Sequence, residues 1–450
     1  MMDLVKAPII LFGYLILAPL LGFLGKGSRK VQGWIFAMMA FMTSWHINKF
    51  TLMLCSVEKY RGHTKGFEFS FIEILALSLI IASVLERKPA DRAWRWLPPG
   101  AILYLLYCAA SWASVFAAPD LLYALMGGVR LTKAVIIFIG AYHFIRKEED
   151  LPILLKALAF TLVVQAIVVL KMKYVDHFYQ VRGWFEHQNP LAMWAYMGGL
   201  PLLATAMTKV SQNETRWYAA GFTASAIIVQ SSLSRASLLA FAAGVILVVG
   251  LATVDRITPK RVVFVLGMSA VGCLGLLLCA HTIIARFHDE GNQASGETRV
   301  VMNLASKEML HHSPVGIGLN NFALTINHPF PYGDVIDDAE RDHGHKVDED
   351  YAKGVVESHY WLLLAETGYP GWAAYLLFIA ATLWWCLRGA LYWRGEIPAA
   401  FLGGLFVALL LVYLHSNLER VLTQTKNFSM WFILLGAAAR LETLRRAARR

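Results

Sequence analysis

The chain has 450 residues, of which 57% are hydrophobic and only 16% are charged, and its mean hydropathy is +0.51. A soluble domain rarely exceeds about half apolar residues, so this composition excludes an ordinary soluble enzyme. The formal net charge of +10 suggests a nucleic-acid-binding protein at first sight. The basic residues are instead distributed over alternate short loops between apolar runs, which argues against a nucleic-acid-binding surface.

Apolar runs of about 18 to 25 residues follow one another along the chain, and each can cross a bilayer as a helix. They predict an all-α polytopic membrane protein with 12 or 13 transmembrane helices. The first run resembles a signal peptide, but Gly25-Lys26-Gly27 follows it without a small-residue cleavage site, so we expect it to be retained. The predicted spans are residues 8–25, 33–54, 70–86, 100–118, 121–145, 151–170, 190–208, 217–233, 236–254, 262–285, 357–386, 397–414 and 427–439.

Lysines and arginines cluster in alternate loops, and the positive-inside rule places these loops in the cytoplasm. The opposite loops, 171–189, 286–354 and 415–425, are then expected outside. The loop after the second span breaks the pattern, because it carries Lys59, Arg61 and Lys65. The clusters assigned to the cytoplasm contain Lys26, Arg29, Lys30, Arg87, Lys88, Arg92, Arg95, Arg146, Lys147, Arg256, Lys260, Arg261, Arg388, Arg394, Arg440, Arg445, Arg446, Arg449 and Arg450.

This pattern predicts one membrane domain with one inserted external domain. The predicted parts are transmembrane helices over 1–285, an external loop domain over 286–356, C-terminal transmembrane helices over 357–439 and a basic cytoplasmic tail over 440–450. Inside the insert we expect a short amphipathic helix from Val300 to Leu310 and a mobile, highly charged lid from Asp334 to Asp350. None of the five cysteines lies in the insert, which excludes a disulfide framework there.

Three residues combine charge with a position at the membrane surface. Arg235 lies in a short gap between two spans, Arg299 begins the amphipathic stretch of the insert, and His359 begins the next span. Arginine pairs bidentately with phosphate oxygens and stays charged when buried, and a neutral histidine can take a proton from a hydroxyl. Each residue also has an ordinary structural interpretation: a snorkelling arginine, a solvated loop arginine, and a histidine bonded to a backbone carbonyl.

Four degenerate motifs follow one another between Gly183 and Gly371. They are Gly183-Trp184-Phe185-Glu186-His187-Gln188-Asn189-Pro190-Leu191-Ala192, Ser234-Arg235-Ala236-Ser237-Leu238-Leu239, Gly296-Glu297-Thr298-Arg299 with His312-Ser313-Pro314-Val315-Gly316-Ile317-Gly318, and Glu357-Ser358-His359-Tyr360-Trp361-Leu362-Leu363-Leu364-Ala365-Glu366-Thr367-Gly368. Their order, the loop parity and the long external loop together resemble the O-antigen ligase and polymerase superfamily of bacterial envelope glycan assembly. The N-terminal third of the chain resembles that family only in being hydrophobic.

The resemblance implies a membrane-helix core of the C-type glycosyltransferase kind in the bacterial inner membrane, with a periplasmic active site and a cytoplasmic C-terminus. Such proteins transfer a glycan from undecaprenyl pyrophosphate to an acceptor hydroxyl on a glycan, on lipid A-core or on a protein. The reaction inverts the anomeric carbon and needs no metal or other cofactor. Matched residue by residue, the family's two arginines fall on Arg235 and Arg299, which would bind the pyrophosphate. Its histidine falls on His359, the expected base.

Six further residues are secondary candidates. Arg130 and Lys133 share one face of a span, where they either line the lipid-phosphate groove or snorkel from a shorter span. Glu366 lies two turns after His359, and we expect it to pair with a structural arginine or a helix end rather than to act directly. The others are Arg182, His187 and Asn189, in the external segment 181–190. His343 and His345 suggest a metal site, but this spacing is more typical of a solvated loop.

Two activities share the expected site. A ligase passes the finished glycan to another acceptor, whereas an O-antigen or exopolysaccharide polymerase passes it to another lipid-linked repeat unit. A polysaccharide transporter is the competing class, since many helices with intramembrane cations fit it too. Transporters usually contain two similar halves and bind near the bilayer midplane, whereas here the polar groups gather at one face and no repeat is visible.

If Arg235 binds the pyrophosphate, Arg235→Lys is expected to lose most of the transfer activity, because a point charge does not replace the planar guanidinium. The rate of glycan transfer in membranes with matched protein levels measures this effect. Turnover near that of the wild type would leave Arg235 a snorkelling role.

Overall fold

A computed structural model describes residues 2–45, 51–87, 95–208, 210–254, 291–342 and 353–448, together with positions 259, 262, 266, 267 and 270. Its elements are α1 (Met2–Phe12), η1 (Gly13–Leu17), α2 (Ala18–Gly25), α3 (Arg29–Met42), β1 (Thr51–Leu54), β2 (Phe67–Ser70), α4 (Phe71–Leu85), α5 (Ala101–Ala113), η3 (Ser114–Ala117), α6 (Leu121–Phe144), η4 (Glu148–Asp150), α7 (Leu151–Tyr174), α8 (Gln188–Ala206), α9 (Gln212–Ser232), α10 (Arg235–Val254), α12 (Gly291–His312), α13 (Phe322–Thr325), η5 (Pro331–Gly333), α14 (Asp334–Asp342), α15 (His359–Tyr392), α16 (Ile397–His415), η6 (Arg420–Thr423) and α17 (Thr425–Ala448).

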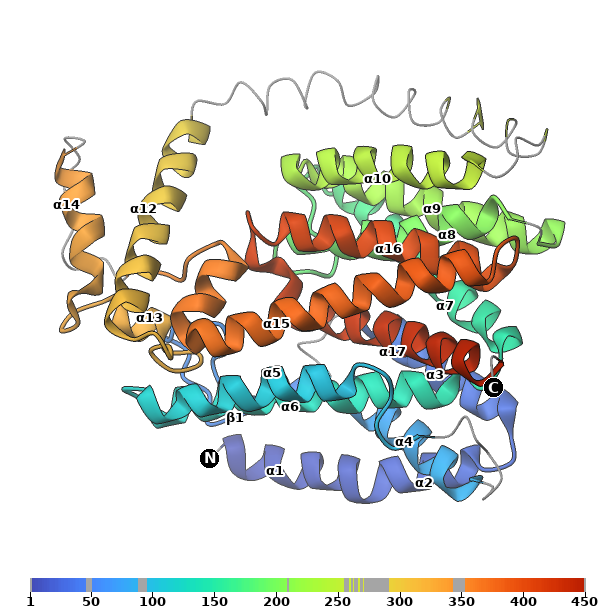
Figure 1. Cartoon of the computed structure of the whole chain (residues 1–450), viewed down its shortest axis with the longest axis horizontal. Coiled ribbons are helices and arrows are strands. Elements are labelled where there is room, and N and C mark those ends of the chain that lie inside the picture. The colour runs from blue at the N-terminus through green and yellow to red at the C-terminus, as the bar shows by residue number, and fades with distance from the viewer. Residues whose placement is uncertain are drawn as a thin grey trace.

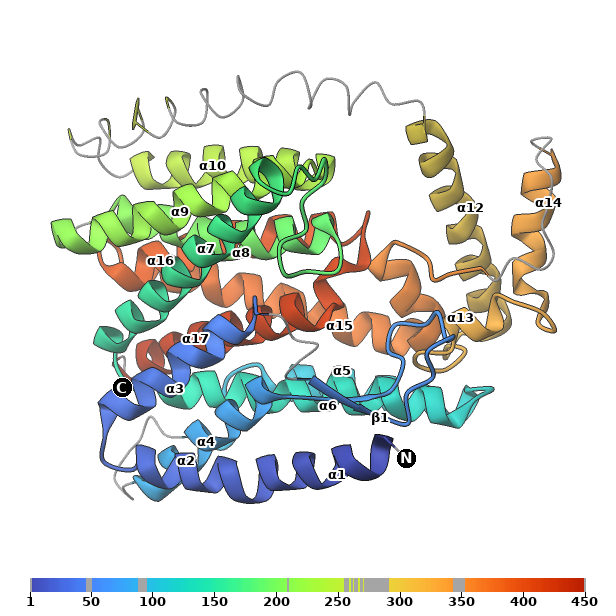
Figure 2. The same cartoon turned by 180° about the vertical axis from the view of Figure 1, so that it is seen from behind.

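The long helices form a bundle in which the chain runs back and forth between two ends, as Figures 1 and 2 show. Helices α12, α13 and α14 lie at one end, which we call the α12 end. The loops before α8 and after α16 lie at this end too, as do β1 and β2 (Figures 1 and 2). The C-terminus and the loop between α15 and α16 lie at the opposite end.

The polytopic helical fold is confirmed. Among the described residues, six helices are long and apolar enough to cross a membrane. They are Val5–Gly25, Leu121–Phe144, Glu148–Tyr174, Arg235–Thr253, His359–Tyr392 and Ile397–His415, and Phe71–Leu85 and Ala101–Ala117 are shorter apolar helices. The total of 12 or 13 spans stays a prediction, because most of the predicted span 262–285 lies outside the described residues.

Three expectations are corrected. The predicted second span, 33–54, is wrong because α3 ends at Met42, where the Thr43 and Ser44 hydroxyls bond the carbonyls of Ala40 and Phe41. Residues 51–54 then form a strand that pairs antiparallel with β2, so the fold is not purely α. In the insert, α12 is longer than the expected 300–310 helix, since it begins at Gly291. The charged stretch expected as a lid begins with α14, and its part 343–350 lies outside the described residues.

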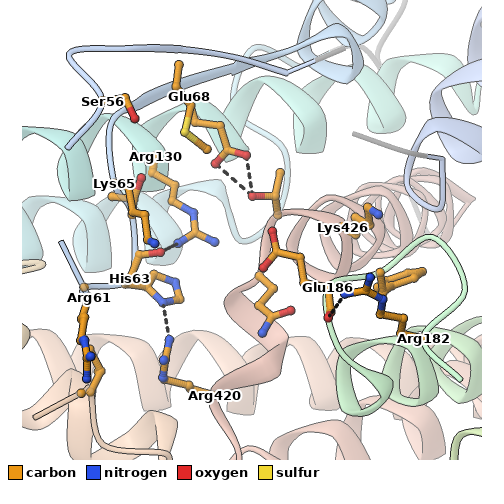
Figure 3. Close-up of a pocket in the computed structure, with 18 of the residues that line it drawn as sticks. Ser56, Arg61, His63, Lys65, Glu68, Arg130, Arg182, Glu186, Arg420 and Lys426 are labelled. Carbon is orange, nitrogen blue, oxygen red and sulfur yellow. Dashed lines mark hydrogen bonds between the residues drawn. The ribbon is translucent and has the colours of Figure 1, made fainter. Parts of the chain in front are cut away.

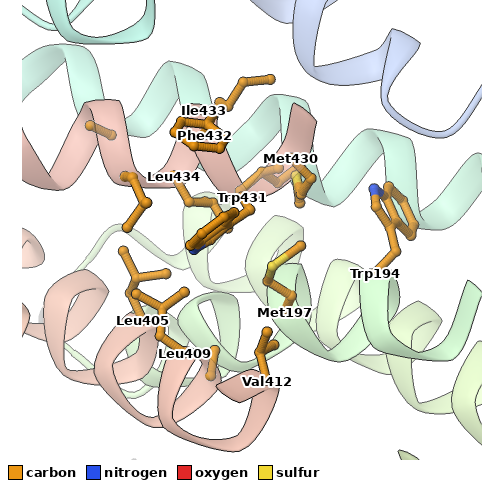
Figure 4. Close-up of a cluster of buried hydrophobic side chains, with 14 of the residues drawn as sticks. Trp194, Met197, Leu405, Leu409, Val412, Met430, Trp431, Phe432, Ile433 and Leu434 are labelled. Atoms are coloured by element: carbon orange, nitrogen blue, oxygen red, sulfur yellow. The ribbon is translucent and has the colours of Figure 1, made fainter. Parts of the chain in front are cut away.

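The core is built around α17, whose residues from Asn427 to Leu441 are all buried. A helix that is covered on every side belongs in the interior of a bundle. Figure 4 shows its side chains Met430 to Leu434 against Trp194 and Met197 of α8 and Leu405, Leu409 and Val412 of α16. The indole of Trp431 donates to the Tyr413 hydroxyl at 3.1 Å, so this large residue is buried without an unpaired donor.

Helix α15 breaks at Gly368, which has φ 63° and ψ −169°, and Pro370 follows with no N–H to donate. The break frees the carbonyls of Ala365 and Glu366, and the amides of Ile317 and Gly318 bond them at 2.9 and 3.1 Å. The amide freed on Tyr369 donates to the carbonyl of Pro314 at 2.9 Å. The turn after α12 therefore replaces the hydrogen bonds that α15 loses, as buried backbone groups require.

The same turn holds a loop from the N-terminal third. Asn320 adopts the left-handed conformation, which asparagine tolerates. Its side-chain oxygen accepts from the Thr64 amide at 3.1 Å, and its side-chain nitrogen donates to the Thr64 carbonyl at 3.0 Å. It also donates to the carbonyl of Tyr123 at 3.1 Å, while the Tyr60 hydroxyl donates to the carbonyl of Asn320. Residues 57–65 are thus fixed to α6 and to the break in α15.

Replacing Gly316 by alanine is expected to destabilise the protein more than the same change at Gly395. Both glycines have left-handed φ, +92° and +85°, so alanine costs about 1–2 kcal/mol at either site. At Gly316 the new methyl also collides with the Glu366 carbonyl, which adds about 1–3 kcal/mol, whereas nothing lies within 4 Å at Gly395. The thermal midpoint in detergent, followed by tryptophan fluorescence, measures the difference. Equal shifts would show that the turn yields without cost.

Candidate functional site

A cavity of about 990 Å³ opens at the α12 end, between segments that are far apart in the sequence. Its wall is formed by α1, by β1 and β2 with the loop between them, by α6, by the loop before α8, by the segment before α15, and by η6 with the start of α17. The described residues that line it are Lys6, Leu52, Met53, Ser56, Arg61, Gly62, His63, Thr64, Lys65, Glu68, Arg130, Arg182, Gly183, Trp184, Phe185, Glu186, Gly354, Val355, Glu357, Arg420, Gln424, Thr425 and Lys426.

This lining is strongly basic. Seven lysines and arginines face three glutamates, so the cavity has an excess of four positive charges with His63 neutral. In the described part of the chain, Arg130, Arg182, Arg420 and Lys426 form no ion pair with a carboxylate, and their hydrogen bonds go to backbone carbonyls or to the His63 ring. A cavity whose cations are held by neutral groups is suited to an anionic ligand.

One side of the cavity is formed by Arg130, His63 and Arg420 (Figure 3). Arg130 donates to the carbonyls of His63, at 3.4 Å, and of Thr423, and Arg420 lies 3.5 Å from the His63 Nδ1. Burial, and then the charges of Arg130, Arg420 and His359, hold the pKa of His63 well below its usual value of 6.5. His63 is therefore neutral near pH 7 and accepts from Arg420 rather than repelling it.

The opposite side is formed by Arg182, Glu186 and Lys426 (Figure 3). Arg182 is exposed and donates to the carbonyl of Glu186 at 3.4 Å. The Lys426 ammonium, in the first turn of α17, donates to the carbonyl of Trp184 and lies 4.6 Å above the Phe185 ring. These contacts join the start of α17 to the loop before α8.

Two of the three principal predicted residues, Arg299 and His359, lie next to this cavity without lining it. Arg299 of α12 pairs with Glu357, two residues before His359, and its Nη2 lies 3.8 Å from Glu419, the neighbour of Arg420. Arg299 thus joins α12 to the segment just before α15 and to the segment just after α16. The pyrophosphate predicted to bind Arg299 would have to share this guanidinium group with the two carboxylates.

His359 is buried beside the cavity rather than in its wall. Its amide donates to the Ser416 carbonyl at 2.9 Å, and its ring packs against Tyr375 with the ring centroids 5.1 Å apart. Within the described structure neither ring nitrogen has a hydrogen-bond partner. An unpaired polar atom in the interior costs about 1–3 kcal/mol, which is tolerated where a ligand completes the site.

Arg235 is the first residue of α10 and is not among the residues that line the cavity. Helix α10 packs on α8 and α16, at the side of the bundle away from α6. The hydroxyls before and after it, Ser234 and Ser237, are buried and bond each other at 3.0 Å. The convergence of Arg235 with Arg299 and His359 stays a prediction.

Two of the six secondary candidates line the cavity, and the other four do not. Arg130 and Arg182 line the cavity, whereas Lys133 lies in the bundle and pairs with Glu73 at 2.9 Å. The remaining three make structural contacts. His187 caps α8 through the Asn189 amide, Asn189 donates to Glu419 at 2.8 Å, and Glu366 accepts from the Phe322 amide at the start of α13, one of its two predicted kinds of partner.

Sequence reasoning missed Arg420, Lys426, His63, Arg61 and Lys65 as site residues. Arg61 and Lys65 did leave a signal, because they are the cations that break the positive-inside pattern. That exception now has a physical reason: the loop carries its charges into the cavity. Arg420 and Lys426 gave no signal, since short loops commonly carry such residues.

A possible metal-binding group lies elsewhere in the described structure. His328, Asp334 and Asp337 bring one donor atom each within 4.8 Å of one another. Lys353 already pairs with Asp337 at 2.8 Å, and none of the three lines the cavity. The sequence-based candidates His343 and His345 lie outside the described residues.

A comparison with protein families matches residues 220–376 to a family described as O-antigen ligase. The match covers roughly a third of the chain and includes Arg235, Arg299, His359 and Glu366. The resemblance predicted from the motifs is confirmed by this match. No curated protein matches the chain.

His63 is expected to make stability depend on pH. Its pKa is lowered in the folded state, so below about pH 6.5 the unfolded chain binds the proton first and stability falls with pH. The thermal midpoint of the wild type should therefore drop more between pH 7.5 and 5.5 than that of His63→Gln. The exposed His312 is the matched control, and His312→Gln should follow the wild type. Parallel curves for wild type and His63→Gln would contradict the lowered pKa.

Proposed function

Because residues 220–376 match a family described as O-antigen ligase, we propose that the chain is a metal-independent, inverting glycan transferase. Its donor is a glycan on undecaprenyl pyrophosphate, and its acceptor is a hydroxyl group. The observation that carries the proposal is the basic cavity at the α12 end, where Arg130, Arg182 and Lys426 are held by carbonyls rather than by carboxylates.

The pyrophosphate is assigned to the side of the cavity formed by Arg130 and Arg420. Two guanidinium groups that share His63 offer planar donors to neighbouring phosphate oxygens. As the glycosidic bond breaks, negative charge grows on the leaving pyrophosphate, so these arginines bind the transition state more strongly than the ground state. Arg299 is proposed to assist from the insert once it exchanges Glu357 for phosphate. Arg235 remains a proposed ligand on the family resemblance alone.

His359 is proposed as the base. Its two unpartnered ring nitrogens lie behind Glu357, which lines the cavity, so a small movement of the segment before α15 would bring the imidazole to an acceptor hydroxyl. The hydroxyl oxygen attacks the anomeric carbon from the face opposite the pyrophosphate, the bond to the pyrophosphate oxygen breaks, and the proton passes to His359. A single displacement of this kind inverts the anomeric centre. It needs no pair of glycosidase carboxylates.

The family resemblance supports a bacterial inner membrane, and the loop charges support the orientation within it. The protein is assigned to the bacterial inner membrane, with the α12 end and the loop domain in the periplasm and the C-terminus in the cytoplasm. The helical bundle is proposed to be a C-type glycosyltransferase core. A ligase that uses lipid A-core, another glycan or a protein as acceptor is the first assignment, and a polymerase that uses a second lipid-linked repeat unit is the alternative.

Reconstitution tests the proposal. Purified protein is incubated with an undecaprenyl-pyrophosphate oligosaccharide alone and then with lipid A-core, and the products are separated on a gel. A shift only with added core supports a ligase, and a ladder from the donor alone supports a polymerase. Donor binding without a product under either condition would overturn the assignment of these acceptors and favour a transporter.

Arg420→Lys and His359→Ala are expected to express normally and to fail in transfer. Loss of the planar donor at Arg420 should lower kcat/KM about tenfold or more, or about 1.4 kcal/mol of transition-state stabilisation. Loss of the base should lower kcat about 100-fold or more. The matched control is Lys171→Gln at the same end, since Lys171 pairs with Asp176 and does not line the cavity. Wild-type kinetics in either site variant would remove that residue from the mechanism.

A further inference from the structure

The charge of the cavity exceeds what the proposed donor head group needs. A pyrophosphate diester carries about two negative charges, one on each esterified phosphate. The described lining has seven cations and three carboxylates, an excess of four positive charges, and one of those carboxylates, Glu357, is already paired with Arg299. If Arg130 and Arg420 bind the pyrophosphate, an uncompensated positive region remains on the other side of the cavity.

That region is formed by Arg182 and Lys426. They come from the loop before α8 and from α17, whereas Arg130 and Arg420 come from α6 and η6. Figure 3 shows the two pairs on opposite sides of the cavity, with Glu186 on the Arg182 side. Glu186 contributes its backbone carbonyl to Arg182, and in the described structure its carboxylate pairs with no cation. Two cations and one carboxylate still leave this side positive.

Aromatic rings adjoin the same cations. Trp184 lines the cavity, is half-buried, and packs against Trp45 with ring centroids 4.5 Å apart. Phe185 lies under the Lys426 ammonium. The C–H faces of pyranose rings pack well on aromatic rings, and cations beside such a surface bind charged substituents of the sugar. A pyrophosphate alone gives no reason for an aromatic surface next to its site.

We infer that Arg182, Lys426 and Trp184 form a second subsite, which binds an acidic sugar of the glycan substrate. The inference rests on the proposed function, because it assigns the first subsite to the donor pyrophosphate. The ligand chemistry is a carboxylate or phosphate carried on a pyranose ring, in the donor or the acceptor glycan. Neutral glycans of the same length should bind less tightly.

The test measures binding of tetragalacturonate and of neutral maltotetraose to the full chain in neutral detergent. Tetragalacturonate should bind at least tenfold more tightly, and more weakly as salt rises. Arg182→Gln with Lys426→Gln should lower its affinity about tenfold or more, while inorganic pyrophosphate affinity changes less than about threefold. Arg182→Gln alone is included because Arg182 is exposed and its hydrogen bond to the Glu186 carbonyl is long, at 3.4 Å, so this variant is expected to fold. Lys171→Gln is the matched control.

Four outcomes would overturn the inference. The first two are equal affinity for the two oligosaccharides, and tetragalacturonate binding that survives in both the double and the single variant. The other two are tetragalacturonate binding that Arg420→Gln removes while the double variant keeps it, and displacement of tetragalacturonate by added phosphatidylglycerol, which would mark a lipid headgroup site. Failure of the proposed function would give a different binding result. In that case pyrophosphate does not bind, or binds equally well to Arg130→Gln and Arg420→Gln.

A second experiment shows whether the acidic sugar belongs to the donor glycan or to the acceptor glycan. In the reconstituted reaction, an acidic donor with a neutral acceptor is compared with the reverse pair, in wild type and Arg182→Gln. The inference expects Arg182→Gln to raise KM, with kcat little changed, only for the pair that places acidic sugar in the second subsite. A uniform loss of kcat in both pairs would mean a merely structural role for Arg182.

Discussion

The rest of the site depends on the break in α15. Gly368 turns the helix out of line and Pro370 has no amide, so two carbonyls and one amide lose their helical partners inside the protein. Such groups must be bonded within the protein, and residues 314–318 bond all three. The turn that follows is held in one place by this requirement. Asn320, within that turn, then fixes the loop that contains His63.

The basic cavity raises the question of how so many like charges are tolerated together. The answer lies in their partners: the carbonyls of Thr423, Trp184, Glu186 and His63 each accept from a cation. Dipoles of this kind orient a guanidinium or ammonium group without neutralising it. Carboxylates in the same places would have stabilised the free protein and weakened its attraction for an anion. The arrangement keeps the field of the cavity available for substrate.

Much of the fold could be predicted from the sequence, because apolar runs and loop charges report directly on helices in a bilayer. The end of α3 was mispredicted because the apolar run continues through Leu52, Met53 and Leu54, which a hydropathy pattern does not separate from a helix. Of the site, Arg299 and His359 lie next to the cavity and their convergence with Arg235 stays a prediction, whereas Lys133 pairs with Glu73 inside the bundle. Arg420 was missed because its role depends on where η6 lies in space, and no local pattern encodes that.

The bond between Thr64 and Asn320 joins residues separated by 256 positions. A ribosome makes the N-terminal partner long before the C-terminal one, so the loop with His63 is made before the turn that holds it. The cavity is therefore completed late in biosynthesis, after the segment between α12 and α15 has been made, and a nascent chain that lacks this segment carries the basic loop without a complete site.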